Sequence, residues 1–278
     1  MYRSGAVALL AVGLLGCGDA GRKQADEAIA KIGGQVEFDD PDSGVARRMI
    51  FDAKSSVGGA DLEVLAGFPE LRELSMAGSP LDDEGATRLA SLTRLERLDL
   101  ADTKVTDSAL ESLKGLKRLQ SLNLKGTGVT DAGIPQLSGF EALEELDLSG
   151  TKVTDAGLAT LAGLPQLKTF RLDGAPIKGP GLEALKGLPA LRTLSIASTP
   201  IDDASLKHLA VVDQIQSLYV GDTPITDAGL ASLKGMKNLK FLSLTSTFVT
   251  DEGVGDLLKA TPGVIIPIRA IREGSPPE

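Results

Sequence analysis

Residues 89–113 read LASLTRLERLDLADTKVTDSALESL, and this stretch decides the fold. Polar and apolar residues alternate over positions 97–101, which predicts a short strand with Leu98 and Leu100 pointing into the core. The VTD triplet that ends at Asp107 predicts the start of a helix, because threonine is a good N-cap and an acidic residue suits the positive end of a helix. One strand and one helix therefore make up one repeat.

A leucine recurs every 24 residues along almost the whole chain. The series comprises Leu65, Leu89, Leu113, Leu137, Leu161, Leu185, Leu209, Leu233 and Leu257. A fixed period of about 20–29 residues is typical of a solenoid, in which each unit buries its apolar face against its neighbours. We expect eight repeats over residues 61–256, capping segments at 24–60 and 257–271, and a disordered tail at 272–278. A long repeated surface favours binding over catalysis.

Each helix should begin at a threonine and end at a glycine. In the quoted unit, Thr106 is the expected N-cap, and Gly115 stands where a left-handed C-cap is expected. Further N-cap threonines are expected at Thr130, Thr154, Thr226 and Thr250, and further C-cap glycines at Gly139, Gly163, Gly187 and Gly235. Leu257 should begin a last helix that the Thr261-Pro262-Gly263 segment ends.

The repeats resemble leucine-rich repeats, LxxLxLxx(N/T), with threonine where asparagine is usual. That position holds Thr103, Thr127, Thr151, Thr199, Thr223 and Thr247, whereas Ser79 and Ala175 depart from it. The VTDAGL helix start is similar to the ribonuclease-inhibitor-like class. The resemblance implies an α/β solenoid, a curved horseshoe with parallel strands on its concave face and α-helices on its convex face. It also implies a non-enzymatic protein–protein interaction module.

Residues that alternate with the inward leucines should point out of the concave face, and we expect the partner to bind there. The N-terminal half of this face carries side chains of both charges, and the C-terminal half is small and polar except for Tyr219 and Phe241. Aromatic residues and arginine dominate interface hot spots. The candidate partner-binding residues are Glu73, Arg97, Asp99, Asn123, Lys125, Glu145, Asp147, Arg171, Asp173, Tyr219 and Phe241. The alternative is an ordinary solvated face, with the contact on an edge or on the helices.

The N-terminus has the organisation of an export signal. Arg3 precedes an apolar run over residues 6–15 that is shorter than the about 20 residues of a spanning helix. Leu14-Leu15-Gly16-Cys17 resembles a bacterial lipobox, which implies removal of residues 1–16 and a diacylglycerol on Cys17, at the start of a tether over 17–23. The alternatives are an ordinary signal or an apolar end with an incidental cysteine.

The lipobox resemblance implies a lipid-anchored protein of the cell envelope. Asp directly after the cysteine favours retention in the inner membrane, but here Gly18 follows Cys17 and Asp19 comes one position later. This order favours the outer membrane. If the signal is not used, the chain is instead a cytoplasmic leucine-rich-repeat adaptor.

Composition argues against several other functions. The formal net charge of −9 disfavours nucleic-acid binding, which requires a basic surface. His208 is the only histidine, and Cys17, the only cysteine, is assigned to the anchor, so no Cys-His or Ser-His catalytic arrangement is expected. Phosphate-loop and metalloprotease motifs are absent, and we expect no cofactor and no bound metal. A structural envelope component that binds glycan or peptidoglycan is the remaining alternative.

Overall fold

The computed structural model describes residues 26–39, 45–55, 57, 59–161 and 163–267, which fall into two compact units. The first unit takes in the chain up to Gly128 together with Gln136–Leu143. The second takes in Val129–Pro135 and the chain from Glu144 onward. The expected export signal, Cys17, the tether and the expected tail at 272–278 lie outside the described residues.

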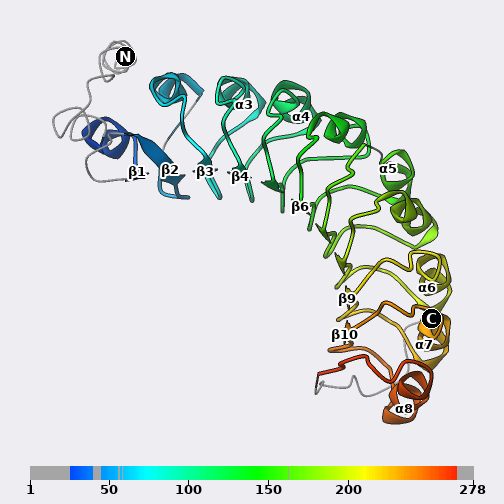
Figure 1. Ribbon diagram of the computed structural model, residues 1–278. Coiled ribbons are helices and arrows are strands. Elements are labelled where there is room, and N and C mark those ends of the chain that lie inside the picture. Colours follow the sequence, from blue (N-terminus) through cyan, green and yellow to red (C-terminus); the bar gives the residue numbers. More distant parts are fainter. Residues whose placement is uncertain (1–25, 40–44, 56, 58, 162, 268–278) are drawn as a thin grey trace. The chain divides into compact units, whose positions relative to one another are not determined.

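In the first unit, five strands lie side by side in chain order. Residues 26–31 are helical, and β1 pairs antiparallel with β2, whereas β2 to β5 pair in parallel. The elements are β1 (Gly34–Phe38), β2 (Ala46–Phe51), η1 (Gly59–Gly67), β3 (Glu73–Ser75), α3 (Asp83–Leu89), β4 (Arg97–Asp99), α4 (Asp107–Leu113) and β5 (Ser121–Asn123). The helices lie along one side of this unit and the strands along the other (Figure 1).

The second unit repeats the arrangement with five parallel strands in chain order. Its elements are β6 (Glu145–Asp147), α5 (Asp155–Thr160), β7 (Thr169–Arg171), η3 (Pro180–Gly187), β8 (Thr193–Ser195), α6 (Asp203–Leu209), β9 (Ser217–Tyr219), α7 (Asp227–Leu233), β10 (Phe241–Ser243) and α8 (Asp251–Ala260). Another 3₁₀ helix, η2 (Ile134–Gly139), is divided between the units after Pro135.

The predicted leucine ladder forms the core. All nine leucines of the 24-residue series are buried, with relative exposures of 0 to 8%. The middle residue of each three-residue strand is also buried: Leu74, Leu98, Leu122, Leu146, Phe170, Leu194, Leu218 and Leu242. Burial of one such side chain stabilises the fold by about 1.5–3 kcal/mol. The core therefore repeats along the chain, and the predicted α/β leucine-rich-repeat solenoid is confirmed.

Left-handed backbone also recurs every 24 residues, but in the loop after the strand and not at the helix end. Residues with φ of 56° to 71° are Gly78, Asp102, Gly126, Gly150, Gly174, Ser198, Asp222 and Ser246. Of the five glycines expected to be left-handed C-caps, only Gly163 has a positive φ. After α4 the chain turns through a bond from Leu116 N–H to the Leu113 carbonyl and needs no left-handed residue. The expectation for Gly115, Gly139, Gly187 and Gly235 was therefore wrong.

Three repeats carry a 3₁₀ helix where an α-helix was expected. After Thr130 the backbone makes three-residue turns, with Gly133 N–H bonding Thr130 and Ile134 N–H bonding Asp131. In an α-helix the next residue would donate to Asp131, but Pro135 has no N–H. Another proline, Pro180, opens η3. The repeat pattern locates these helical segments, and Pro135 accounts for the type of η2. Pro180 does not account for the type of η3 in the same way, because an α-helix also tolerates proline in its first turn.

Neighbouring repeats are joined by a hydrogen-bonded ladder of aspartate and threonine, which we call the Asp–Thr ladder. In each pair an aspartate accepts bonds from the main-chain N–H and the hydroxyl of the threonine one repeat later, at 2.6–2.8 Å. Three of these aspartates are the first residues of α3, α6 and α7, and the fourth precedes η2. The pairs are Asp83–Thr106, Asp131–Thr154, Asp203–Thr226 and Asp227–Thr250. Sequence analysis considered the aspartate after a capping threonine only for its effect on the helix dipole and missed the ladder.

The threonine caps are only partly as predicted. Thr154, Thr226 and Thr250 accept a bond from an N–H of their own helix. Thr106 stands at the N-cap position of α4 and donates its hydroxyl to Asp83, but it makes no side-chain cap bond. Leu257 lies inside α8, which begins at Asp251, so the expectation that a helix starts at Leu257 was wrong.

Candidate partner-binding surface

The side chains that flank the buried middle of each strand form rows on the surface that we call the strand face of each unit. In the first unit the parallel register sets Glu73 beside Arg97 and Asp99 beside Asn123. Lys125 lies two residues after Asn123, beyond the end of β5, and its carbonyl accepts a bond from the N–H of Asp102 in the repeat before. These five candidate residues therefore share one surface.

In the second unit the register builds two corresponding rows. One row runs from Glu145 through Thr169, Thr193 and Ser217 to Phe241. The next runs from Asp147 through Arg171, Ser195 and Tyr219 to Ser243. Asp173 follows β7 and bonds to the turn after β8. The six remaining candidates thus share the strand face of the second unit.

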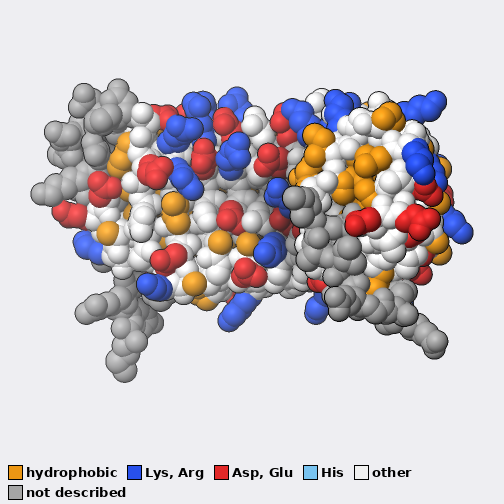
Figure 2. Space-filling model, turned by 90° about the horizontal axis from the view of Figure 1, so that it is seen from below, with side chains coloured by type: hydrophobic (Ala, Val, Ile, Leu, Met, Phe, Trp, Pro, Cys, Tyr) orange, Lys and Arg blue, Asp and Glu red, His pale blue; other side chains and the backbone are white. Residues whose placement is uncertain are grey.

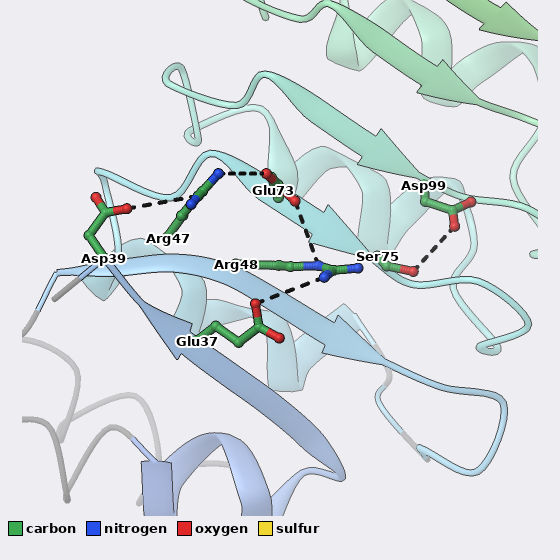
Figure 3. A network of polar contacts seen from close by, with 7 residues as sticks. All are labelled: Glu37, Asp39, Arg47, Arg48, Glu73, Ser75 and Asp99. Carbon is green, nitrogen blue, oxygen red and sulfur yellow. Dashed lines mark hydrogen bonds and ion pairs between the residues drawn. The ribbon is translucent and has the colours of Figure 1, made fainter. Parts of the chain in front are cut away.

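Ion pairs join the strands at the start of the first unit. Arg47 lies between Asp39 and Glu73 at 3.8 and 3.6 Å, and Arg48 lies between Glu37 and Glu73 at 3.9 and 3.6 Å (Figure 3). Side chains of both charges are interspersed over this unit in the left part of Figure 2. Exposed pairs of this kind contribute about 0–1 kcal/mol each. Their effect is mainly to fix where Glu73 points.

The row that holds the last residue of each strand is called the central row, and its aspartate and asparagine side chains have structural roles as well. Asp99, Asn123 and Asp147 each accept a bond from the main-chain N–H two residues later, at 2.8–3.1 Å, which closes the turn after the strand. Asp173 accepts the N–H of Ala197 at 2.8 Å and the hydroxyl of Ser195. These side chains are therefore held by the protein itself before any partner binds.

The arginines of the two strand faces differ from these residues. Within the described part of the chain, neither Arg97 nor Arg171 has an ion pair or a hydrogen bond from its side chain, and both are exposed. Arginine carries five donors in a planar fork that matches carboxylates. Together with Lys125, which is also exposed and has no ion pair within the described residues, these two arginines are the cations that the strand faces offer to a partner.

Beside Arg97 the strand face is hollowed by about 240 Å³. The lining consists of Arg48, Glu73, Leu74, Ser75, Arg97, Leu98, Asp99, Ser121 and Asn123. Asp99 also accepts a bond from the Ser75 hydroxyl at 3.3 Å across the strands (Figure 3). Sequence analysis missed Arg48 and Ser75 as site residues, although Ser75 lies in the central row beside Asp99.

An apolar cluster marks the strand face of the second unit. The rings of Tyr219 and Phe241 lie 5.2 Å apart and are tilted by 41°. Ile265 forms an isolated parallel bridge with Phe241 and is 65% exposed, and Tyr219 is 37% exposed. We call Tyr219, Phe241 and Ile265 the aromatic cluster. Ile265 was missed because its segment was assigned to a cap, although an apolar residue beside an edge strand was a usable signal.

Chemistry other than binding finds little support in the described residues. His208 Nδ1 lies 2.7 Å from Glu183 on the exposed helix side. Hydrogen bonds from Ser205 lower the pKa of Asp202, where they form a helix cap. Over the described ranges, no group of three or more histidine, cysteine or acidic residues is placed to hold a metal ion. None of the helices in those ranges has the length and apolarity needed to cross a membrane.

Comparison with known proteins agrees with this architecture. Residues 91–114 and 142–162 match the family model described as Leucine Rich repeat. The crystal structure of internalin C2 from Listeria monocytogenes str. 4b F2365 is similar, with a TM-score of 0.54 and 26% identity over 80% of this chain and 87% of that chain. No curated protein matches the sequence.

The fold is thus the α/β solenoid of leucine-rich-repeat proteins. This fold is typical of non-enzymatic scaffolds that bind protein partners. Because 534 chains of solved structures match, the fold alone does not select a partner. Any specificity has to come from the side chains of the strand faces and of the other surfaces.

Proposed function

We propose that this protein is a lipid-anchored module of the cell envelope that holds a protein partner on its strand face. The aromatic cluster is the observation that carries the proposal. Of the three large hydrophobic residues that are exposed in the described chain, Tyr219 and Ile265 both adjoin Phe241, and the third is Val211. Apolar and aromatic side chains that gather on one exposed surface are typical of a protein interface.

The polar surroundings of the aromatic cluster fit the same role. Thr193, Ser195, Ser217 and Ser243 lie on the same rows as the two rings. Small polar residues around large apolar anchors resemble the rim of an interface, which excludes water from the anchors. We therefore expect Tyr219 and Phe241 to be the main contacts and Arg171 to contribute a charged one.

The anchor is proposed from the N-terminal sequence. The LLGC segment that ends at Cys17 would place a diacylglycerol at the mature N-terminus, and the order of Gly18 and Asp19 favours the outer membrane. The net charge of −9 argues against nucleic acid as the partner. Intact mass and membrane partition, compared with a Cys17→Ser variant, test the anchor. An unprocessed, soluble chain would favour the cytoplasmic adaptor.

The proposed interface is tested by capture of partners from the native host. Proteins retained by the parent are compared with those retained by Tyr219→Ala and by Phe241→Ala, and Val211→Ala is the matched control. Val211 is 52% exposed in the turn after α6 and lies on no strand. Loss of a hot spot costs about 2 kcal/mol or more, which is roughly 30-fold in affinity. The same discrete protein should be lost from both strand-face variants and retained by Val211→Ala.

Other results would support other functions. A protein that is retained equally by all four chains would place the contact on an edge or on the helices. Weak retention of many proteins, combined with binding to isolated peptidoglycan, would favour the structural envelope component. Circular dichroism of each variant shows whether the fold is kept.

A further inference from the structure

We propose that the hollow on the strand face of the first unit is a subsite for an acidic side chain of the partner, with Arg97 as the cation that receives it. The inference rests on the proposed function in one respect, that the partner is a protein. It adds a second contact, of defined chemistry, at a place that does not include the aromatic cluster.

Within the described ranges the Arg97 side chain has no partner, because its acidic neighbours are engaged elsewhere. Glu73 lies beside it in the strand register, but the Glu73 carboxylate is 3.6 Å from both Arg47 and Arg48. Asp99 lies two residues further along β4, but its carboxylate accepts bonds from Ser75 and from the N–H of Ala101. Both acids that could pair with Arg97 are therefore turned toward other groups.

A second donor faces the same hollow. The Asn123 side-chain oxygen accepts the N–H of Lys125 at 3.0 Å, which directs the amide group. Within the described residues the Asn123 amide nitrogen makes no hydrogen bond. An amide N–H donates to a main-chain carbonyl. Arg97 and Asn123 together can therefore receive a carboxylate and a carbonyl that follows it in an extended chain.

The size of the hollow selects a side chain over a whole small molecule. Its volume of about 240 Å³ lies below the roughly 300–1,000 Å³ of pockets that enclose small ligands. Strands spaced about 4.8 Å apart leave room for an extended segment that lies across β3, β4 and β5. One acidic side chain on such a segment would fit into the hollow.

The charges around Arg97 select a carboxylate over a phosphate. Two carboxylates, Glu73 and Asp99, line the same hollow. A dianionic phosphate would face both of them, whereas a carboxylate carries one charge and matches the guanidinium in a bidentate arrangement. A polyanion would in addition meet a chain of net charge −9. The expected ligand is therefore an aspartate or glutamate side chain.

The test uses the full chain as the Cys17→Ser variant, so that it carries no acyl group, with ¹⁵N-labelled arginine. The probe is N-acetyl-glutamate methylamide, and N-acetyl-glutamine methylamide is its neutral isostere. We expect saturable shifts of the Arg97 side-chain resonance with the glutamate probe and at least tenfold weaker binding of the glutamine probe. Inorganic phosphate should bind more weakly than the glutamate probe.

Arg97→Gln should weaken binding of the glutamate probe at least tenfold, and Asn123→Ala should weaken it several-fold. The matched control is Arg118→Gln, because Arg118 is also exposed and, among the described residues, its side chain makes no ion pair. That variant removes the same charge away from the hollow. Circular dichroism should be unchanged in all three.

The inference is overturned if the glutamine probe or phosphate binds as well as the glutamate probe. It is also overturned if Arg118→Gln weakens binding as much as Arg97→Gln. Failure of the proposed function would look different. A partner retained by Tyr219→Ala and by Phe241→Ala, together with normal binding of the glutamate probe, would remove the aromatic cluster as the interface and leave the hollow in place.

Discussion

The strand faces of the two units have the same backbone and different surfaces. In the first unit the rows carry ion pairs and a hollow. In the second unit they carry small polar residues and two adjacent aromatic rings. Beneath both faces the middle residue of each three-residue strand, β3 to β10, is buried, and in seven of these eight strands it is leucine. The core is thus specified separately from the surface, so side chains on the rows can differ without altering the fold.

The largest effect is expected where the units are alike, in the core. Leu98→Ala in β4 and Leu218→Ala in β9 remove side chains that are 2% and 0% exposed. Each should lower the free energy of unfolding by about 2–5 kcal/mol, because a buried apolar contact is lost and a cavity remains. Urea denaturation measures both. A loss below about 1 kcal/mol at one site would show that its unit does not depend on the repeated core.

The Asp–Thr ladder should matter in both units. Asp83→Ala and Asp203→Ala each remove two hydrogen bonds to the next repeat, at 2.6–2.8 Å. We expect each to cost about 1–3 kcal/mol, since a main-chain N–H loses its acceptor. The control Asp213→Ala lies at an exposed turn and should change unfolding by less than about 0.5 kcal/mol. Equal losses of unfolding free energy in all three variants would mean that removal of a negative charge, and not loss of the ladder bonds, causes the effect.

The helix caps give a pH-dependent contrast between the units. Asp202 caps α6 and receives bonds from the hydroxyl and N–H of Ser205, which lower its pKa, whereas Asp82 caps α3 with one bond from Gly85 N–H. The part of the Asp202 cap that depends on the charge of the carboxylate should be complete above the unfolded pKa of about 3.9. It should be lost as the pH falls through the lower folded pKa.

Unfolding free energies of the parent and of Asp202→Asn, measured between about pH 2 and pH 6, check this prediction. The difference between the two chains should shrink as the pH falls through the folded pKa of the carboxyl. A difference that does not change with pH would mean that the charge of Asp202 adds nothing to the cap.

The smallest effect concerns one repeat position that differs within the first unit. Thr103 donates its hydroxyl to the Leu100 carbonyl at 2.7 Å, whereas the buried Ser79 hydroxyl has no hydrogen-bond partner among the residues that the structure describes. Thr103→Ala should cost about 1 kcal/mol. Ser79→Ala should be neutral or should stabilise by up to about 1 kcal/mol, because an unsatisfied group is removed. Thermal unfolding of both variants measures these effects. A clear loss of stability in Ser79→Ala would contradict the view that its hydroxyl is unsatisfied.

Sequence alone located the core and the rows of both strand faces, because burial imposes a strict 24-residue period. The conformation of the turns was less predictable. Asp102 and Ser198 adopt the left-handed backbone that Gly78 and Gly126 adopt, so residue type did not reveal the position. Only the shared period of 24 does so.

Contacts between repeats also could not be predicted from the sequence of a single repeat. Asp83 has the sequence of a helix start, and its bond to Thr106 depends on how the next repeat stacks. The ends of the repeat array were missed for a related reason. Arg48 and Ile265 lie where the pattern fades, yet both line a strand face through pairing with a regular strand. The candidate residues were thus identified more completely within the repeats than at their ends.

The central claim is that the strand face of the second unit contacts a protein partner. The most direct test places a photoactivatable amino acid at position 219 and, as a control, at position 211 in the native host. The account predicts a discrete adduct of higher mass from position 219 and none from position 211. An adduct from position 211 alone, or no adduct from either position, would contradict it.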